Sequence, residues 1–149
     1  MPPIMSNKRK AGRPVIRKIP NQTARIIVPK ERIIEKYEIE TFLRMTKFGF
    51  DVEVLQARYM PNMRTPDSLW NNEYWEVKSV AATGKNSVAN ALKNAKGQSS
   101  RIILDLSKSK APINKYIGGV MREMKRKKSI QKIIIFRQKE YCLLTRDML

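Results

Sequence analysis

The chain has 149 residues, the length of one ordinary globular domain, and its 31 Lys and Arg against 13 Asp and Glu give a formal net charge of +18. It contains no histidine and a single cysteine, Cys142, which excludes an internal disulfide, a Cys/His zinc site and every mechanism that needs an imidazole. Any bound metal must therefore have oxygen ligands, as Mg²⁺ and Mn²⁺ do, and the positive charge predicts a nucleic acid as partner.

No apolar run in the sequence is long enough to cross a bilayer or to form the core of a signal peptide, since the longest, such as residues 133–136, have about four residues. The sequence therefore predicts a soluble protein without a membrane partner. A lone cysteine is typical of a reducing compartment such as the cytoplasm.

Residues 1–30 hold eight of the Lys and Arg residues, five of the eight prolines and no acidic residue. Such a composition cannot bury enough apolar surface to offset chain entropy, so we expect a flexible basic arm or linker over residues 1–30 and one domain over residues 31–149. The arm either contacts phosphates or is a solvated tether, and its charge pattern favours neither.

From about residue 31, hydrophobic periodicity and turn signals predict a regular series of elements. In chain order these are a helix ending at Gly49, a strand over 50–55, two strands over 68–70 and 73–80 around an Asn71-Asn72 turn, a helix over 86–98, a strand over 101–106, a basic helix over 113–127, and strands over 133–136 and 141–144. This order predicts a mixed α/β fold with one central sheet.

The predicted hairpin brings two acidic residues together. If Asn71-Asn72 is a two-residue turn, Asp67 lies opposite Glu76, and strand alternation places Lys78 on the same face as Glu76. Two facing carboxylates repel each other unless a cation lies between them or one is protonated. The pattern indicates an oxygen-ligand metal site with an ammonium group beside it. The alternative is a solvated cluster of salt bridges on a surface hairpin.

A site of this kind suits phosphodiester hydrolysis. A divalent cation held by Asp67 and Glu76 lowers the pKa of a bound water and supplies hydroxide without a histidine. Lys78 could orient that water or neutralise the charge that develops in the transition state. Glu38 or Glu40 in the first helix could complete the ligand shell or bind a second metal ion.

These residues also carry a family resemblance. Pro66-Asp67 followed by Glu76-Val77-Lys78 resembles the PD-(D/E)xK signature of restriction-endonuclease-like nucleases. The stretch from Trp75 to Ser79 resembles their W-E-(I/V)-K-S catalytic strand, and residues 40–52 and 86–106 resemble the helix before it and the helix and strand after it. Together these stretches cover about residues 35–140. They are most similar to the tRNA-nuclease toxin domain at the C-terminus of contact-dependent growth inhibition (CdiA) proteins and other polymorphic toxins.

The resemblance implies a PD-(D/E)xK core, a central mixed sheet flanked by helices. It implies a catalytic set of Glu40, Asp67, Glu76 and Lys78, with the Val77 carbonyl as a further metal ligand. Gln98 would be an accessory active-site residue, or else only an exposed glutamine at a helix end. The cofactor would be Mg²⁺ or Mn²⁺.

The resemblance also implies a biological setting. The substrate would be tRNA, with DNA second, and the domain would act in the cytoplasm after delivery as part of a larger secreted toxin, with an acidic immunity protein as partner. A phage-encoded or free-standing relative is the alternative to an excised module. A non-catalytic nucleic-acid-binding module is the alternative to an endonuclease.

Basic residues near the end of the helix over 113–127 are denser than complementation of a helix dipole requires. We expect them to contact nucleic-acid phosphates, although an ordinary solvated face would have the same composition. Lys85, in a loop after the catalytic strand, could touch a phosphate or be only a turn residue. Trp70, Tyr74 and Trp75 could stack on bases, although strand aromatics more often pack in the core. The helix residues are Arg122, Lys125, Arg126, Lys127 and Lys128.

Overall fold

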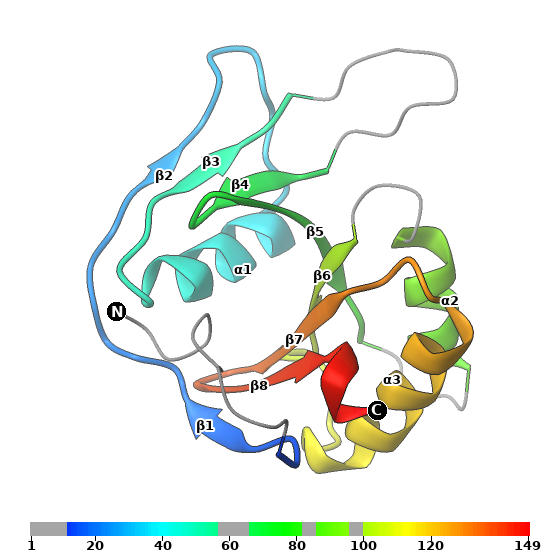
Figure 1. Cartoon of the computed structure of the whole chain (residues 1–149). Helices are drawn as coiled ribbons and strands as arrows, with labels where there is room; N and C mark the ends of the chain where they lie inside the picture. Colours follow the sequence, from blue (N-terminus) through cyan, green and yellow to red (C-terminus); the bar gives the residue numbers. More distant parts are fainter. Residues whose placement is uncertain (1–11, 57–65, 82–85, 96–99) are drawn as a thin grey trace, which may run out of the picture.

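The computed structural model describes residues 12–56, 66–81, 86–95 and 100–149, without the side chains of residues 94 and 95 (Figure 1). Within these ranges the chain forms eight strands, three α-helices and a short 3₁₀ helix. In chain order they are β1 (Ile16–Lys18), β2 (Ile26–Ile27), α1 (Lys36–Thr46), β3 (Val52–Val54), β4 (Ser68–Trp70), β5 (Glu73–Ser79), α2 (Ser87–Ala95), β6 (Arg101–Asp105), α3 (Asn114–Arg126), β7 (Lys132–Arg137), β8 (Glu140–Thr145) and the 3₁₀ turn Arg146–Met148.

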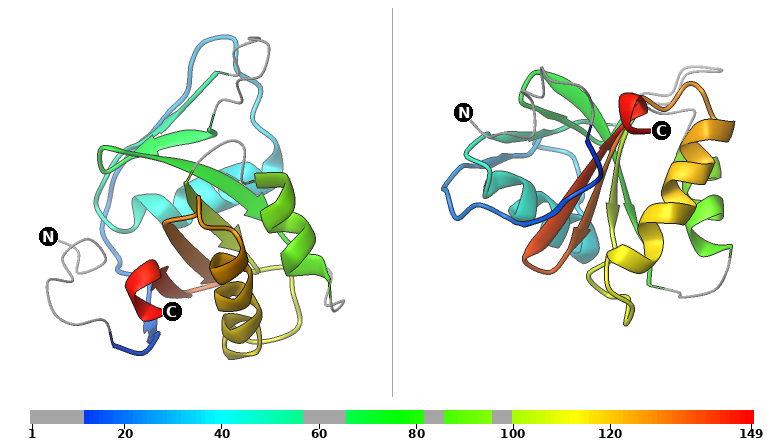
Figure 2. Two further views of the ribbon diagram at one scale, coloured as in Figure 1. Left: turned by 45° about the vertical axis from the view of Figure 1, so that its right-hand side comes forward. Right: turned by 60° about the horizontal axis from the view of Figure 1, so that its bottom comes forward.

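The strands form one sheet in the order β1-β8-β7-β6-β5-β4-β3-β2. Strands β5, β6 and β7 are parallel, as expected for strands joined by helical crossovers, while β4 and β8 run antiparallel to their neighbours in the centre. Helix α1 covers one face of the sheet, and α2 and α3 cover the other, which the right-hand view of Figure 2 shows edge-on. The prediction of a central mixed sheet flanked by helices is confirmed. No helix in the described ranges is long and apolar enough to cross a membrane.

Alternate residues of the central strands enter two separate cores. Trp75 and Val77 of β5 pack with Phe42 on the α1 side of the sheet. Residues of β6 such as Ile102 pack with Val120 and other residues of α2 and α3 on the opposite side. Each buried side chain of this size contributes about 1.5–3 kcal/mol to folding. The period of two along each strand thus separates the molecule into an α1 side and an α2/α3 side.

The two tryptophans are core residues. Trp70 and Trp75 are both 0% exposed, and their rings meet edge to face with centroids 5.7 Å apart. Neither ring can therefore stack on a base. Tyr74, between them in the hairpin, is about half exposed and keeps a face toward solvent.

Helix α1 begins later than the apolar pattern predicts. Ile33 continues the periodicity but is 82% exposed, and the helix starts only after Glu35. The Glu38 side chain accepts a hydrogen bond from the Glu35 backbone N–H, which forms one half of a capping box. After the helix ends at Thr46, Gly49 has a φ of +92°, a conformation that favours glycine, and a Cβ there would also clash with Gln22.

Residues 12–30 correct the expectation of an unstructured arm. Within them β1 pairs with β8, with Ile16 opposite Cys142, and β2 pairs with β3, with Ile26 opposite Val52. These strands have only three and two residues and bury little side-chain surface, so hydrophobic patterning could not reveal them. They are held mainly by backbone hydrogen bonds, which any sequence can supply. Residues 1–11 lie outside the described ranges.

Strands β1 and β2 lie at opposite edges of the sheet, although only residues 19–25 separate them. A flat sheet of eight strands would be about 33 Å across. The chain from Lys18 to Ile26 spans at most about 28 Å. The sheet therefore curls around α1, and the connecting segment runs past the end of that helix (Figure 1). Its backbone is fixed there, because Ile19 N donates to the Lys139 carbonyl at 2.7 Å and Gln22 N donates to the Lys47 carbonyl at 3.0 Å.

The C-terminal end of α3 is fixed by one side chain. The Arg146 guanidinium donates to the carbonyl oxygens of Met124 at 2.7 Å and of Ile130 at 2.6 Å, and more weakly to that of Lys127 at 3.3 Å. Carbonyls in the last turn of a helix lack intrahelical partners, and a cation near them is favourable. Arg146 therefore orients the basic end of α3.

Candidate functional site

The site is built on the β4–β5 hairpin, whose turn the sequence specifies. Asn71 and Asn72 have φ values of +50° and +63°, as a two-residue type I′ turn requires, and asparagine tolerates this conformation better than most residues. The resulting register pairs Trp70 with Glu73 and Ser68 with Trp75. The predicted hairpin register is confirmed.

Asp67 is held in place just before β4 by two backbone groups. Its Oδ2 accepts a hydrogen bond from the Val77 N–H at 2.8 Å, and its carbonyl accepts one from the Leu55 N–H at 2.9 Å. The first contact ties the carboxylate directly to β5. Asp67 is half-buried, so its side chain remains accessible.

Glu76 and Lys78 project from the α2/α3 side of the sheet, because they alternate with Trp75 and Val77, which belong to the core on the α1 side. Glu76 is only 1% exposed. The Lys78 Nζ lies 3.4 Å from Glu76 Oε2, and Glu76 Oε1 has no hydrogen-bond partner among the described residues. A buried carboxylate oxygen without a donor is rare in proteins, because its desolvation costs free energy that no contact offsets.

The surroundings of Glu76 change its acidity. Burial, the largest cause, and the negative charge of Asp67 together raise the pKa of Glu76 from 4.5 to about 8, against the opposing effect of Lys78. The carboxyl group is therefore largely protonated at neutral pH unless another cation joins it. The two acids are close enough to influence each other, as the hairpin register predicts.

The donor set fits a hard divalent cation. Asp67 and Glu76 supply carboxylate oxygens, and Glu76 Oε1 is a buried acceptor that a cation would satisfy. Within the described ranges no group of three Asp, Glu, His or Cys side chains is arranged to hold a metal ion. Further ligands would therefore be water, substrate oxygens or a backbone carbonyl such as that of Val77.

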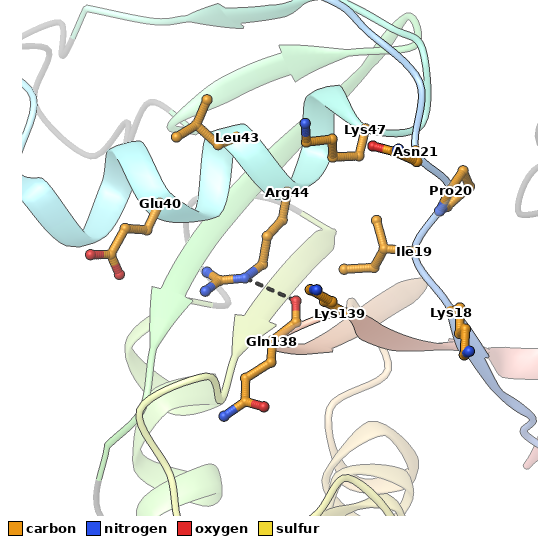
Figure 3. A pocket seen from close by; sticks show the side chains of 10 residues that line it. All are labelled: Lys18, Ile19, Pro20, Asn21, Glu40, Leu43, Arg44, Lys47, Gln138 and Lys139. Carbon is orange, nitrogen blue, oxygen red and sulfur yellow. Dashed lines mark hydrogen bonds between the residues drawn. The ribbon is translucent and has the colours of Figure 1, made fainter.

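The structure does not bring Glu40 to this pair. Helix α1 covers the face of the sheet opposite to Glu76, and Glu40 lines a cavity on that side, with its carboxylate pointing away from the other labelled side chains (Figure 3). The role of Glu40 as a metal ligand stays a prediction. Glu38 is also engaged elsewhere, because it is buried and pairs with Arg32 at 2.8 Å.

Two other predicted residues, Gln98 and Lys85, lie outside the described residues, so their roles stay predictions. Val77 is described, and its side chain is buried in the core on the α1 side. Its N–H donates to Asp67, which makes Val77 part of the site through its backbone.

The basic helix presents four of its five predicted residues to solvent: Arg122, Lys125, Arg126 and Lys128. Arg126 and Lys127 both pair with the buried Glu123, but the Lys127 side chain is only 16% exposed, against 72% for Arg126. The Lys127 hydrogen bond is the main reason why the pKa of Glu123 is lowered, with Arg126 and Arg122 adding to it. Lys127 is therefore partly committed to the fold. The i, i+4 spacing of Glu123 and Lys127 in the sequence indicates this ion pair.

Sequence reasoning missed a cavity of about 570 Å³ on the α1 side. Its walls come from residues 18–21, the outer face of α1 and the β7–β8 turn, and three lysines from these segments surround it (Figure 3). They are Lys18, Lys47 and Lys139. No sequence signal could have found this cavity, because its walls lie far apart in the chain and meet only after folding.

Comparisons with known proteins bear on the same region. A model of the family described as "Contact-dependent growth inhibition CdiA C-terminal domain" matches residues 64–141, more than half of the chain, and this stretch includes Asp67, Glu76 and Lys78. Among solved structures, the fold is similar to a chain of the CdiA-CT/CdiI toxin and immunity complex from Burkholderia pseudomallei. That match has a TM-score of 0.55 and 15% sequence identity, and covers 81% of this chain and 98% of the other. No curated protein matches the sequence significantly.

Proposed function

The chain belongs to the CdiA C-terminal toxin domain family of contact-dependent growth inhibition, and from this premise we propose that it is a metal-dependent endonuclease that cleaves tRNA. The observation that supports the proposal is the state of Glu76. This carboxyl group is buried, lies beside Asp67 and Lys78, and has an oxygen without a donor in the described part of the chain. An arrangement that is unfavourable for folding is typical of a functional site.

Asp67 and Glu76 would hold a divalent cation, Mg²⁺ or Mn²⁺, through their oxygens. When bound, the cation supplies Lewis-acid activation of a water molecule for attack on a phosphodiester. The Val77 N–H keeps the Asp67 carboxylate oriented, and the rigid β5 strand sets the position of Glu76 relative to it. These contacts fix the geometry before a substrate arrives, which is what catalysis by positioning requires.

Lys78 would stabilise negative charge on the phosphate during hydrolysis. Its side chain is 29% exposed and its ammonium group lies near one oxygen of Glu76, so it can reach a substrate without leaving the site. A fixed positive charge in a partly dehydrated site stabilises a developing anion far more than the same charge does in water.

The basic helix would bind the nucleic-acid backbone. Val120 and Met124 of α3 pack in the same core as Ile102, which pairs with Glu76 across β5 and β6. The exposed cations of α3, which are Arg122, Lys125 and Arg126, therefore belong to the helix on the same side of the sheet as Glu76 and Lys78. A nucleic-acid backbone that contacts these cations would lie on the same side of the sheet as Glu76. Each phosphate that they neutralise increases the salt dependence of binding.

As a toxin, the domain would act in the cytoplasm of a target cell after delivery as part of a larger secreted protein. An acidic immunity protein would shield the basic surface, since complementary charge favours such association. The similar fold in a toxin and immunity complex supports this partner.

Two alternatives share parts of this surface. A DNA endonuclease would use the same carboxylates and lysine, and a non-catalytic nucleic-acid-binding module would use only the basic helix. The buried, underpaired Glu76 favours an enzyme, because a binding module has no use for a carboxylate pair beside its cationic surface.

The test incubates tRNA and plasmid DNA in parallel with the protein, in Mg²⁺, Mn²⁺ or EDTA. We expect tRNA to be cut and EDTA to stop the reaction. Glu76→Gln and Lys78→Ala should each lower the rate by about a thousandfold, as loss of a group that acts in the transition state does. Glu53→Gln is the matched control, because Glu53 is an exposed acid on β3 of the same sheet, and the rate should not change.

The outcomes separate the alternatives. Plasmid cleavage without tRNA cleavage would identify a DNA endonuclease. Binding of either nucleic acid without metal-dependent cleavage, unaffected by Glu76→Gln, would identify a binding module and overturn the proposed activity. End-mapping of the tRNA fragments would then locate the cut.

A further inference from the structure

The cavity on the α1 side has a fixed shape. The Ile19 and Gln22 backbone bonds described above hold one wall against the turn after β7 and the end of α1. On the other wall, the Arg44 guanidinium donates to the Gln138 carbonyl at 3.2 Å and to Asp105 at 2.5 Å. A volume of about 570 Å³ is within the usual range for small-molecule sites. The cavity is therefore preformed and large enough for a ligand.

The charge of the cavity is strongly positive and unsatisfied. Lys18, Lys47 and Lys139 form no ion pair with any residue that the structure describes. They come from three segments that border the cavity, so an anion bound there meets positive charge from more than one side. The acid of the lining, Glu40, lies at the other end, with its carboxylate directed away from them (Figure 3). The cavity thus has an anion-binding end.

The rest of the lining is mixed. Ile19 and Leu43 present apolar surface, with Ile19 extending from its segment toward Arg44 in Figure 3. The side-chain amides of Asn21 and Gln138 can donate and accept hydrogen bonds. A cationic end, an apolar wall and neutral polar groups match the phosphate, the flat face and the polar edges of a nucleotide.

We infer that this cavity binds a nucleoside phosphate, with the phosphate near Lys47 and Lys139 and the base against Leu43 and Ile19. This site is separate from Asp67, Glu76 and Lys78, none of which lines the cavity, and Glu76 and Lys78 project from the other side of the sheet. The nucleotide is either a free metabolite or one unit of an RNA chain, since both present the same chemistry.

The first experiment titrates adenosine 5′-monophosphate (AMP) into the full chain and follows binding by calorimetry and by backbone amide NMR shifts. We expect AMP to bind at least tenfold more tightly than adenosine or inorganic phosphate, with shifts at Asn21, Leu43 and Gln138. Leu43→Glu should lower AMP affinity at least tenfold. Its matched control is Ile39→Glu, one turn earlier on α1, which adds the same charge at a similarly exposed apolar residue and should change the affinity less than twofold.

A second pair of variants tests the anion-binding end. Replacing Lys18, Lys47 and Lys139 together by Gln should abolish AMP binding, whereas replacing the exposed Lys108, Lys110 and Lys115 by Gln should not, although both variants lose three charges. Circular dichroism confirms that each variant is folded. Absence of AMP binding at millimolar concentration, or equal effects of the two triple variants, would overturn the inference.

A third arm distinguishes the two sources of the nucleotide. Binding of single-stranded RNA is measured with Glu76→Gln as the background, with and without AMP. If AMP competes with RNA and Leu43→Glu weakens RNA binding, the cavity takes one unit of the chain. If AMP binds without competing, the ligand is a free nucleotide. Neither readout depends on cleavage, so a failure of the proposed endonuclease activity would leave this test intact.

Discussion

Two buried carboxylates on neighbouring strands have opposite surroundings. Asp105, at the end of β6, is 3% exposed and accepts hydrogen bonds from Thr41 Oγ1 at 2.5 Å, from Arg44 Nη1 at 2.5 Å and from the Ser107 N–H at 3.0 Å. Glu76, on β5, is 1% exposed and has one lysine at 3.4 Å, an acidic neighbour and an oxygen without a donor in the described ranges.

The comparison indicates that Asp105 stabilises the fold, whereas Glu76 is available to a ligand. Asp105 joins α1 to the sheet through Thr41 and Arg44, so its charge is compensated where it lies. Glu76 is compensated only in part, and its burial opposes folding when it is ionised. A chain under selection for stability alone would have an apolar residue at this position, because Glu76 is buried and lies opposite Ile102 of β6.

The sharpest test of this contrast is the pH dependence of stability in EDTA. The pKa of Glu76 is about 4.5 in the unfolded chain and about 8 in the folded protein, so folding takes up a proton between these pH values. The free energy of unfolding should therefore fall as pH rises from about 4.5 to about 8, by at most about 1.4 kcal/mol per pH unit, and then level off.

Glu76→Gln removes this titration. We expect the variant to match the parent near pH 4.5 and to exceed it by about 3 kcal/mol at pH 8.5, measured by urea denaturation. Addition of Mg²⁺ should reduce the gap, because a cation favours the ionised carboxylate of the parent. If the free energy of unfolding depends on pH in the same way for parent and variant, ionisation of the buried Glu76 does not oppose folding.

Asp105→Asn tests the other side of the contrast. The substitution leaves Arg44 partly buried beside a neutral group, and we expect a loss of about 2 kcal/mol in the free energy of unfolding. The rate of tRNA cleavage by the folded fraction should stay near that of the parent. A large loss of rate at full folding would instead make Asp105 part of the active site.

Glu73 provides a third acid, on the same strand as Glu76. It pairs with Arg101 Nε at 2.6 Å and with Lys132 Nζ at 3.1 Å, and all three side chains are partly exposed. Glu73→Gln should therefore cost about 1 kcal/mol of stability in thermal or urea unfolding, with no effect on cleavage. A stabilising effect at high pH, as expected for Glu76→Gln, would remove the distinction between the two acids.

The smallest expected effect compares two lysines at the end of α3, namely Lys127, which pairs with Glu123, and Lys125, which forms no ion pair with any described residue. Lys125→Gln should reduce the slope of log K against log salt for RNA binding by about one, because an exposed cation that contacts a phosphate is lost. Lys127→Gln should chiefly lower stability, since it leaves the buried Glu123 with a weaker partner. Anisotropy titrations with labelled RNA in the Glu76→Gln background measure the first effect, and equal slopes for all variants would contradict it.

The hairpin and its register could be predicted because the information is local. Asn71 and Asn72 favour one turn, and a two-residue turn dictates the pairs that follow up to Ser68 with Trp75, which brings Asp67 next to β5. The order of elements after residue 31 was predictable for a similar reason, since each element has its own hydrophobic period.

Features that depend on tertiary packing could not be predicted in this way. Helix periodicity places Glu40 on a face of α1 but does not tell which side of the sheet that helix covers. The apolar pattern runs through Ile33, although nothing packs against that side chain closely enough to bury it. Strands β1 and β2 pair with β8 and β3, at sheet edges that exist only once the sheet has folded. Whether Glu76 keeps a free oxygen depends on all its neighbours at once.

The segment over residues 19–25 sets a limit on the shape of the whole domain. Because it joins the two outermost strands, its contour length determines how far the sheet can open around α1. Glycines inserted beside the exposed Thr23 would relax that limit, let the edges move apart and loosen the packing of Phe42 and Phe48. A short segment without helix or strand thus limits the curvature of the whole sheet.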